Sequence, residues 1–250
     1  RCVPKPFPVS LEGFFSVAQT PPQHIPVLCI DGPTASGKGT VAALLAQRLG
    51  YHFLDSGAMY RITALAARRA GLSIDGAHEA RVAELARQLP VRFDGARVLL
   101  GADDVSDAIR TEEAGMNASR VSALPAVRQA LVALQHGFRR LPGLVADGRD
   151  MGTVIFPDAP LKVFLTASAQ QRAERRYNQL ISKGFRANIA DLRADLEARD
   201  ARDSTRSVAP LQPAQDALVL DNSDLTIEQT VERVLAWWQE RQPFAPRASG

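Results

Sequence analysis

The chain contains little cysteine and no long apolar run. Cysteine occurs only at Cys2 and Cys29, and Cys29 lies in an apolar stretch where a small buried thiol is expected. This usage predicts neither a disulfide framework nor a zinc site, and it suits a reducing compartment such as the cytoplasm. No apolar run approaches the ~20 residues that span a bilayer, so we expect no membrane segment.

The N-terminal segment also lacks the pattern of a signal peptide. The stretch Val9–Ala18 is interrupted by polar residues and glycine, and no clear cleavage site follows it. Prolines are frequent in residues 1–24, which we expect to be a flexible extension outside the fold. Residues 25–240 would then form the main domain, and residues 241–250 a C-terminal tail.

Charge of one sign is not in large excess. The net charge is +3, with 46% hydrophobic and 23% charged residues among 250, which is ordinary for a single domain with a small insertion. The basic residues fall at the ends of predicted strands and helices and not along one exposed stripe. We therefore expect no nucleic-acid partner.

Short apolar strands alternate with amphipathic helices through most of the chain, which predicts a parallel sheet in an α/β fold. Residues 74–120 differ, because a helix at Glu79–Leu89 precedes a hairpin signal between Val91–Asp94 and Arg97–Leu100. Local strand pairing there predicts an inserted subdomain. The expected strands are 27–30, 52–54, 144–146, 161–165 and 217–220, and the expected helices include 58–70, 188–203 and one that begins with a capping box at Thr226 and Gln229.

A glycine-rich loop joins the first strand to the first helix. It reads Gly32-Pro33-Thr34-Ala35-Ser36-Gly37-Lys38-Gly39-Thr40 and matches the spacing of a phosphate-binding loop, except that Gly39 separates Lys38 from Thr40. Its backbone amides and the helix N-terminus would bind phosphates, Lys38 would reach the β- and γ-phosphates of ATP, and Thr40 would hold Mg²⁺. The alternative is a glycine-rich turn with a surface lysine.

Arginine and aspartate follow two other predicted strands. Ser56 and Arg61 come after the second strand, and Asp147, Arg149 and Asp150 after the third. Ligands gather at the carboxyl ends of parallel strands, so Arg61 and Arg149 are placed to bind a phosphate and Asp147 to orient water on magnesium. Asp150 would accept from a base amino group. The alternatives are a solvated helix start and an aspartate-capped turn.

The helix that Asn188 would cap changes from apolar to charged residues along its inward face. Leu192 and Leu196 begin an apolar stripe that continues into Arg199, Arg202, Asp203 and Arg206. A face that packs a core does not normally become this charged, so we favour a site for an anionic ligand. The alternative is a surface ion-pair face, because Glu197, Asp200 and Asp203 lie nearby.

Together these segments resemble the bacterial cytidylate kinases from about Val27 to Trp238. The motifs are GPTASGKGT, LDSGAMYR, DDVSDAIRTEE, LVADGRDMGTVIFPDAP, KGF, ERRYNQL and ARDARDSTRSVAPL. The resemblance implies a five-stranded parallel sheet flanked by helices, with a monophosphate-binding insertion at about 81–120 and a lid at about 199–208. It also implies a cytoplasmic monomer that uses ATP and Mg²⁺ to phosphorylate CMP or dCMP.

The resemblance further implies a role for individual residues. Residues 32–40 would bind ATP phosphates, and Lys38, Arg149, Arg202 and Arg206 would be catalytic. The CMP site would comprise Ser56, Ser119, Arg128 and Asp150 around cytosine, Arg61, Arg149 and Arg206 on the phosphate, Arg199 and Asp203 on the ribose, and Tyr60. One departure is that Thr34-Ala35-Ser36 stands where the family often has Ser-Gly-Ala.

Two other functions remain open from the residues. The nearer one is another small-acceptor kinase, acting on uridylate or shikimate. The other is a non-catalytic nucleotide-binding switch, which would not need arginines converging on a second phosphate. A panel of acceptors with ATP separates all three.

Overall fold

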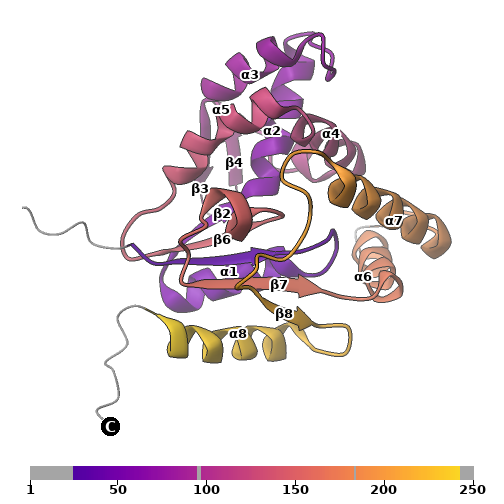
Figure 1. The fold of residues 1–250 in the computed structure, drawn as a ribbon. Coiled ribbons are helices and arrows are strands. Elements are labelled where there is room, and N and C mark those ends of the chain that lie inside the picture. Colours follow the sequence, from indigo (N-terminus) through magenta and orange to yellow (C-terminus); the bar gives the residue numbers. More distant parts are fainter. Residues whose placement is uncertain (1–24, 95–96, 183, 243–250) are drawn as a thin grey trace, which may run out of the picture.

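The main sheet has five parallel strands. The computed structural model describes residues 25–94, 97–182 and 184–242. The strand order is β2-β6-β1-β7-β8, as Figure 1 shows, and every neighbouring pair is parallel. The bounds are β1 (Val27–Asp31), β2 (His52–Asp55), β6 (Leu144–Gly148), β7 (Leu161–Thr166) and β8 (Leu218–Asp221). The predicted five-stranded α/β fold is confirmed.

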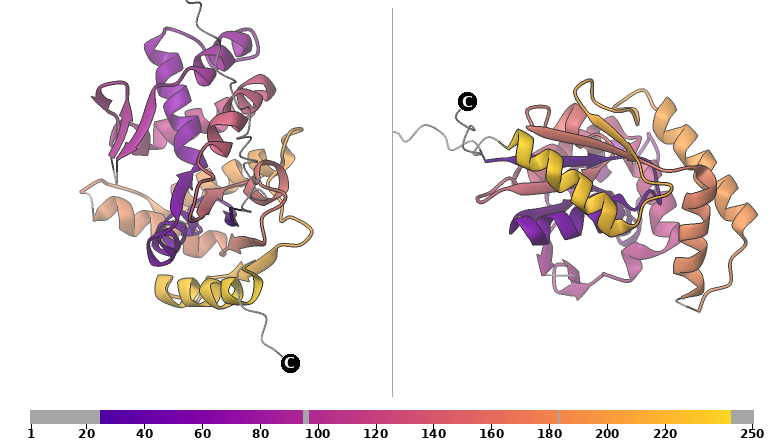
Figure 2. Two further views of the ribbon diagram at one scale, coloured as in Figure 1. Left: turned by 90° about the vertical axis from the view of Figure 1, so that its left-hand side faces the viewer. Right: turned by 90° about the horizontal axis from the view of Figure 1, so that it is seen from below.

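Helices cover both faces of this sheet. Along β1, Leu28 and Ile30 pack with α1 (Lys38–Leu49) and α8 (Ile227–Arg241), whereas Val27 and Cys29 face the opposite cluster. That second cluster is built from α2 (Ser56–Arg69), α3 (Glu79–Arg87), α4 (Glu112–Ser122) and α5 (Pro125–His136). Figures 1 and 2 show α8 beside α1 on one side and α2 to α5 on the other. Alternating side chains of one strand thus bury two separate cores.

The helix ends follow the sequence signals. Gly50, with φ 64°, ends α1, and the Asn188 side chain accepts a hydrogen bond from the Ala190 amide at the start of α7 (Ile189–Thr205). At α8 the capping box of Thr226 and Gln229 is complete. The predicted caps at Asn188 and Thr226 are confirmed.

The segment between α2 and α5 contains a second, three-stranded sheet. The strands β3 (Val91–Asp94) and β4 (Arg97–Leu100) pair antiparallel, as the hairpin signal predicted. The short β5 (Asp103–Asp104) adds a third strand, and η1 (Ala108–Arg110) leads into α4. Neither β5 nor α4 was predicted, because two exposed aspartates carry no strand signal.

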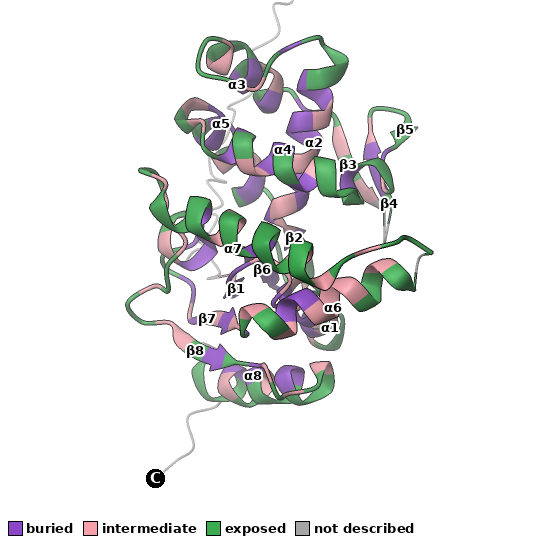
Figure 3. Ribbon diagram, turned by 90° about the vertical axis from the view of Figure 1, so that its right-hand side faces the viewer, coloured by how far each residue is buried: buried purple, intermediate pink, exposed green. Residues whose placement is uncertain are grey.

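Two helices stand at the carboxyl end of the main sheet. The arrowhead of β7 in Figure 1 points toward α6 (Ala169–Ile181), against which α7 packs, and Figure 3 shows α7 largely exposed on its outer side. One wide helical turn, η2 (Met151–Ile155), follows β6. No helix of the described ranges has the length and apolarity to cross a membrane. The expected extension 1–24 with Cys2, and most of the expected tail, lie outside the described residues.

Candidate active site

The glycine-rich loop lies between β1 and the first turn of α1. A side chain at Gly32, where φ is 152°, would place its Cβ 2.0 Å from the carbonyl oxygen of Leu165 in β7. Gly37 precedes α1 with φ 88°. Ala35 also has a positive φ, 60°, a left-handed conformation that glycine adopts without a Cβ clash. This is the position where the resembled family often has glycine.

Long side chains fix the loop through its carbonyl groups. Lys38 Nζ donates to Pro33 O at 3.0 Å, Arg172 to Thr34 O at 3.0 Å, Arg175 to Ser36 O at 3.2 Å, and Asn222 Nδ2 to Ser36 O at 3.0 Å. Because these carbonyls are already bound, the amides of the same peptides face the opposite way, as an anion-binding loop requires. Arg172, Arg175 and Asn222 were not identified from the sequence.

Lys38 and Asp147 are buried beside the start of α1. Burial, and then the charge of Arg149, lower the pKa of Lys38 to about 7, while burial raises the pKa of Asp147 to about 6. A Cβ on Gly39 would come within 3.1 Å of Asp147 Oδ2, so a side chain between Lys38 and Thr40 would require Asp147 to shift. Asp147 lies inside β6, which runs two residues beyond its predicted end, and not in a turn after it.

These residues fit a magnesium ion held mainly by substrate phosphates. Asp147 Oδ1 is buried without a hydrogen-bond partner, and the Thr40 side chain is exposed at the first turn of α1. Within the described ranges no three His, Cys, Asp or Glu residues form a metal-binding group. Mg²⁺ commonly takes one or two protein oxygens and completes its shell with phosphates and water, so this sparse set suits it.

Arg149 connects the loop to α7. Its NH2 group donates to the Thr34 hydroxyl, and its Nε donates to Asp203 Oδ2 at 3.1 Å. Asp203 is buried on α7, and Arg206 follows at the end of that helix, where its Nε donates to Ala209 O. The predicted residues Thr34, Arg149 and Asp203 are therefore in direct contact.

Asp31 at the end of β1 holds the segment that follows Arg149. Its carboxylate accepts from the amides of Met151 and Gly152, each at 2.8 Å. Burial raises the pKa of Asp31 to about 7, and the two amide bonds act against that shift. Asp31 was not predicted as a site residue, although its position directly before Gly32 is visible in the sequence.

A buried ion pair forms the base of the second half of the site. Arg128 on α5 pairs with Asp150, and both side chains are less than a tenth exposed. Arg128 also donates to Ser122 O at 3.3 Å and lies 5.7 Å from the centre of the Tyr60 ring. Arg206 reaches the same neighbourhood, since its NH1 is 3.5 Å from Ser122 Oγ. Arg128, Asp150, Tyr60 and Arg206 thus lie close together.

Ser56 is the first residue of α2 and is buried against α5. Its hydroxyl donates to Gln135 Oε1 at 2.9 Å. Ser119 lies on α4, partly exposed, one turn before Ser122. Gln135 was not identified from the sequence, where a glutamine on the apolar face of a predicted helix gave no signal.

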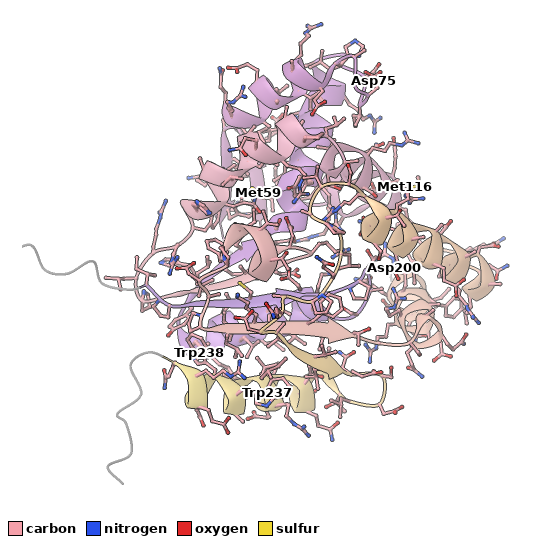
Figure 4. All side chains as sticks on the ribbon, in the orientation of Figure 1. Met59, Asp75, Met116, Asp200, Trp237 and Trp238 are labelled. Carbon is pink, nitrogen blue, oxygen red and sulfur yellow. The ribbon has the colours of Figure 1, made fainter. Side chains whose placement is uncertain are left out.

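The helix α7 is attached to the loop through α6. Asp200 and Arg172 form an ion pair of 2.5 Å, and the same Arg172 binds Thr34 O. Figure 4 shows Asp200 on the part of α7 that lies next to α6. Arg199, whose pKa burial lowers to about 10, contacts α4, since a Cβ on Gly115 would meet its NH1 at 3.1 Å.

Arg202 does not share the inward face of α7. It is exposed, whereas Leu196 and Asp203 are buried. Six residues at 3.6 per turn put Arg202 about a third of a turn away from Leu196, so the predicted stripe was wrong at this position. Its expected catalytic role stays a prediction.

Among the described residues, several buried polar atoms around this site have no hydrogen-bond partner, which is rare in a folded interior. They are Ser36 Oγ, Asp147 Oδ1, Arg61 Nε, Arg199 Nε and Arg206 NH2. Three of the five are guanidinium nitrogens, and they belong to α2 and to α7 and its end. Cations that converge without anionic partners point to an anionic ligand between them.

Comparisons with known proteins agree with this geometry. The family model described as cytidylate kinase matches residues 28–240. The chain is 59% identical to the cytidylate kinase of Cupriavidus necator over 88% of its own length and 98% of that protein. It is 57% identical to that of Polynucleobacter asymbioticus (86% and 97%) and 59% identical to that of Bordetella bronchiseptica (86% and 95%).

Proposed function

The chain belongs to the cytidylate kinase family, and from that premise we propose how its residues divide the reaction between them. The protein transfers the γ-phosphoryl group of ATP to CMP or dCMP, giving ADP and CDP or dCDP. Two sets of residues carry the two nucleotides. We call the loop 32–40 with Arg172, Arg175 and Asn222 the donor half, and the set Ser56, Tyr60, Arg61, Ser119, Arg128, Arg149, Asp150, Arg199, Asp203 and Arg206 the acceptor half.

The donor half binds ATP through backbone amides and one lysine. The carbonyls of the loop are already bound by Arg172, Arg175 and Asn222, so the loop amides converge on the β- and γ-phosphates. Lys38 has its pKa lowered to about 7 by burial, and the approach of anionic phosphates restores its charge. Thr40 would hold magnesium directly and Asp147 would hold it through water, and the ion would neutralise charge on the phosphates.

The acceptor half binds the monophosphate. Arg61, Arg149 and Arg206 neutralise its phosphate, Arg199 and Asp203 hold the ribose, and Asp150, Arg128, Ser56 and Ser119 read the base. An acceptor phosphate is already anionic near neutral pH, so the reaction needs no general base. In-line placement and charge neutralisation supply the rate acceleration.

The segment 199–208 acts as a lid, and residues 81–120 as the monophosphate-binding insertion. Arg149, Arg206 and, after closure, Arg202 surround the transferring group as its charge spreads. Closure that requires both nucleotides keeps water from the phosphoryl group. We further propose that the protein is a cytoplasmic monomer without a nucleic-acid partner, in agreement with its scarce cysteine and modest charge.

The position of Arg149 is the observation that carries this assignment. One guanidinium contacts both the Thr34 hydroxyl of the loop and Asp203 of α7. A non-catalytic switch would not need an arginine shared between two phosphate sites. The first test is ADP formation from ATP and magnesium with CMP, dCMP, UMP, AMP and shikimate as acceptors. Fast turnover with CMP and dCMP supports the proposal, and ADP formation that is independent of acceptor overturns it.

Asp150→Ala tests the base contact within the same panel. Loss of this carboxylate should raise the rate with UMP relative to CMP, because uracil lacks the amino group that Asp150 accepts from. Discrimination equal to that of the unaltered protein would remove Asp150 from the base-reading set.

A further inference from the structure

A fully buried glutamine lies behind the proposed base-reading serine. Gln135 on α5 has no exposed surface, and it was absent from the site expected by sequence. Burying an amide in an apolar core costs free energy unless each polar atom finds a partner. Gln135 has two: its Nε2 donates to Leu131 O at 3.3 Å, and its Oε1 accepts from Ser56 Oγ at 2.9 Å.

These two partners fix the orientation of the amide. A backbone carbonyl can only accept, so the NH₂ end of Gln135 faces Leu131 O. The reversed amide would set two carbonyl oxygens against each other and an NH₂ group against the Ser56 hydroxyl. The Gln135 oxygen therefore faces Ser56, and an oxygen there requires that the hydroxyl donate.

A serine hydroxyl has a single hydrogen. Once that hydrogen is directed at Gln135, Ser56 presents only lone pairs to a ligand. Asp150, whose carboxylate is paired with Arg128, likewise presents only acceptor oxygens. Cytosine carries an amino donor at C4, whereas uracil carries an oxygen acceptor there, so two acceptor side chains favour cytosine and repel uracil.

We propose that Gln135 is a specificity-determining positioning residue, which orients the Ser56 hydroxyl so that the pocket accepts a hydrogen bond from the base and rejects uracil. The inference rests on the proposed function, in which Ser56 contacts the base. It goes beyond that function because Gln135 acts through Ser56 and contacts no substrate. Without Gln135 the hydroxyl could rotate and donate to the uracil oxygen.

The test measures kcat/KM for CMP and for UMP at saturating ATP. In Gln135→Leu, which fills the core without an acceptor, the CMP-to-UMP ratio should fall about tenfold, the size expected for one hydrogen bond of about 1.4 kcal/mol. The KM for ATP should stay within twofold. In Gln135→Glu a buried, protonated carboxyl can donate to Leu131 O and still turn its carbonyl oxygen to Ser56, so the ratio should remain near its original value.

Double variants separate positioning from packing. In a Ser56→Ala background, Gln135→Leu should change the ratio no further, because the hydroxyl that it orients is gone. Equal loss with both acceptors in Gln135→Leu would show a merely structural role and overturn the inference. A ratio unchanged in Gln135→Leu, with the ratio lowered in Ser56→Ala, overturns it as well.

The same set distinguishes failure of the inference from failure of the proposed site. If Ser56→Ala alone leaves the ratio unchanged, Ser56 does not read the base, and the assignment under the proposed function is what fails. Thermal unfolding verifies that each variant is folded. Gln135→Met, which is unbranched like glutamine, replaces the leucine variant if that one is unfolded, with the same expected fall in ratio.

Discussion

The two halves of the site are held in different ways. In the donor half, side chains from α1, α6 and the end of β8 bind backbone carbonyls of the loop 32–40. In the acceptor half, side chains bind one another across elements, as in Arg149–Asp203, Arg128–Asp150 and Ser56–Gln135. The unpartnered guanidinium nitrogens of Arg61, Arg199 and Arg206 lie in this half.

From this difference we expect the donor half to be preformed and the acceptor half to rearrange when a ligand binds. The peptide groups of the loop 32–40 are fixed by hydrogen bonds to their carbonyl oxygens. We therefore expect the donor half to keep its shape when ATP leaves. Side-chain pairs can exchange one partner for a ligand, and buried nitrogens without partners favour that exchange. We therefore expect the acceptor half, next to which the proposed lid at 199–208 lies, to control turnover, and the donor half to control ATP affinity.

The most severe disruption of this division is the loss of Arg149, which contacts both halves. Arg149→Ala should lower kcat by roughly 100- to 1000-fold, because it removes charge neutralisation at the transferring group. The KM for ATP should change much less. Steady-state kinetics with CMP measure both constants, and Arg140→Ala, at an exposed arginine that contacts only the Gly137 carbonyl among its described hydrogen bonds, is the matched control. Equal losses in kcat and ATP affinity would contradict the division.

The link between the halves is the ion pair of Arg172 with Asp200. Asp200→Asn weakens the attachment of α7 while Arg172 still binds Thr34 O. We expect kcat to fall roughly 10- to 100-fold through misplacement of the α7 arginines, with little change in the KM for ATP. Hydrolysis of ATP without acceptor should rise relative to transfer. Asp195→Asn, at an exposed position of the same helix, should leave both rates unchanged.

The donor half was predictable because its signal is local. The residues from Val27 to Gly50 contain the strand, the loop, the helix and its glycine stop in unbroken order, and each of these is present. The acceptor half combines residues from distant parts of the chain. Arg61, Arg149 and Asp203 were identified by their position at element ends and by a family resemblance, and spacing alone did not give their partners.

The residues that were missed are those whose role depends on tertiary contacts. Arg172 and Arg175 lie on a helix rich in charge, where nothing in the sequence separates a loop-binding arginine from a solvated one. Gln135 lay on an apolar stripe and carried no signal. The prediction for Arg202 was wrong about its face, because the helical period places this residue about a third of a turn away from Leu196.

The stability of the protein should depend on pH through Asp31, which binds the segment that follows Arg149. Its pKa is raised from 3.8 to about 7, so between these values the folded state binds more protons than the unfolded state. Stability from this group is complete below pH 4 and is lost as the pH rises through 7, at a slope of at most about 1.4 kcal/mol per pH unit. The free energy of unfolding, measured by urea unfolding at each pH from 4 to 8, should fall less steeply with pH in Asp31→Asn than in the unaltered protein. Parallel curves would contradict this role.

The smallest effect expected lies in the rigid donor half itself. Ala35 adopts a φ of 60°, and a left-handed alanine costs about 1 kcal/mol relative to glycine. Ala35→Gly should therefore raise the free energy of unfolding by up to about 1 kcal/mol, or the melting temperature by about 2–4 °C. The same exchange at Ala43, exposed in the middle of α1, should lower stability by a similar amount, because helical glycine is disfavoured. Opposite signs for two identical exchanges would show that loop strain, and not chain flexibility in general, sets the outcome. If kcat is unchanged in Ala35→Gly, the conformation of the donor loop does not depend on the residue at position 35. The carbonyl contacts of Arg172, Arg175 and Asn222 are then sufficient to maintain it.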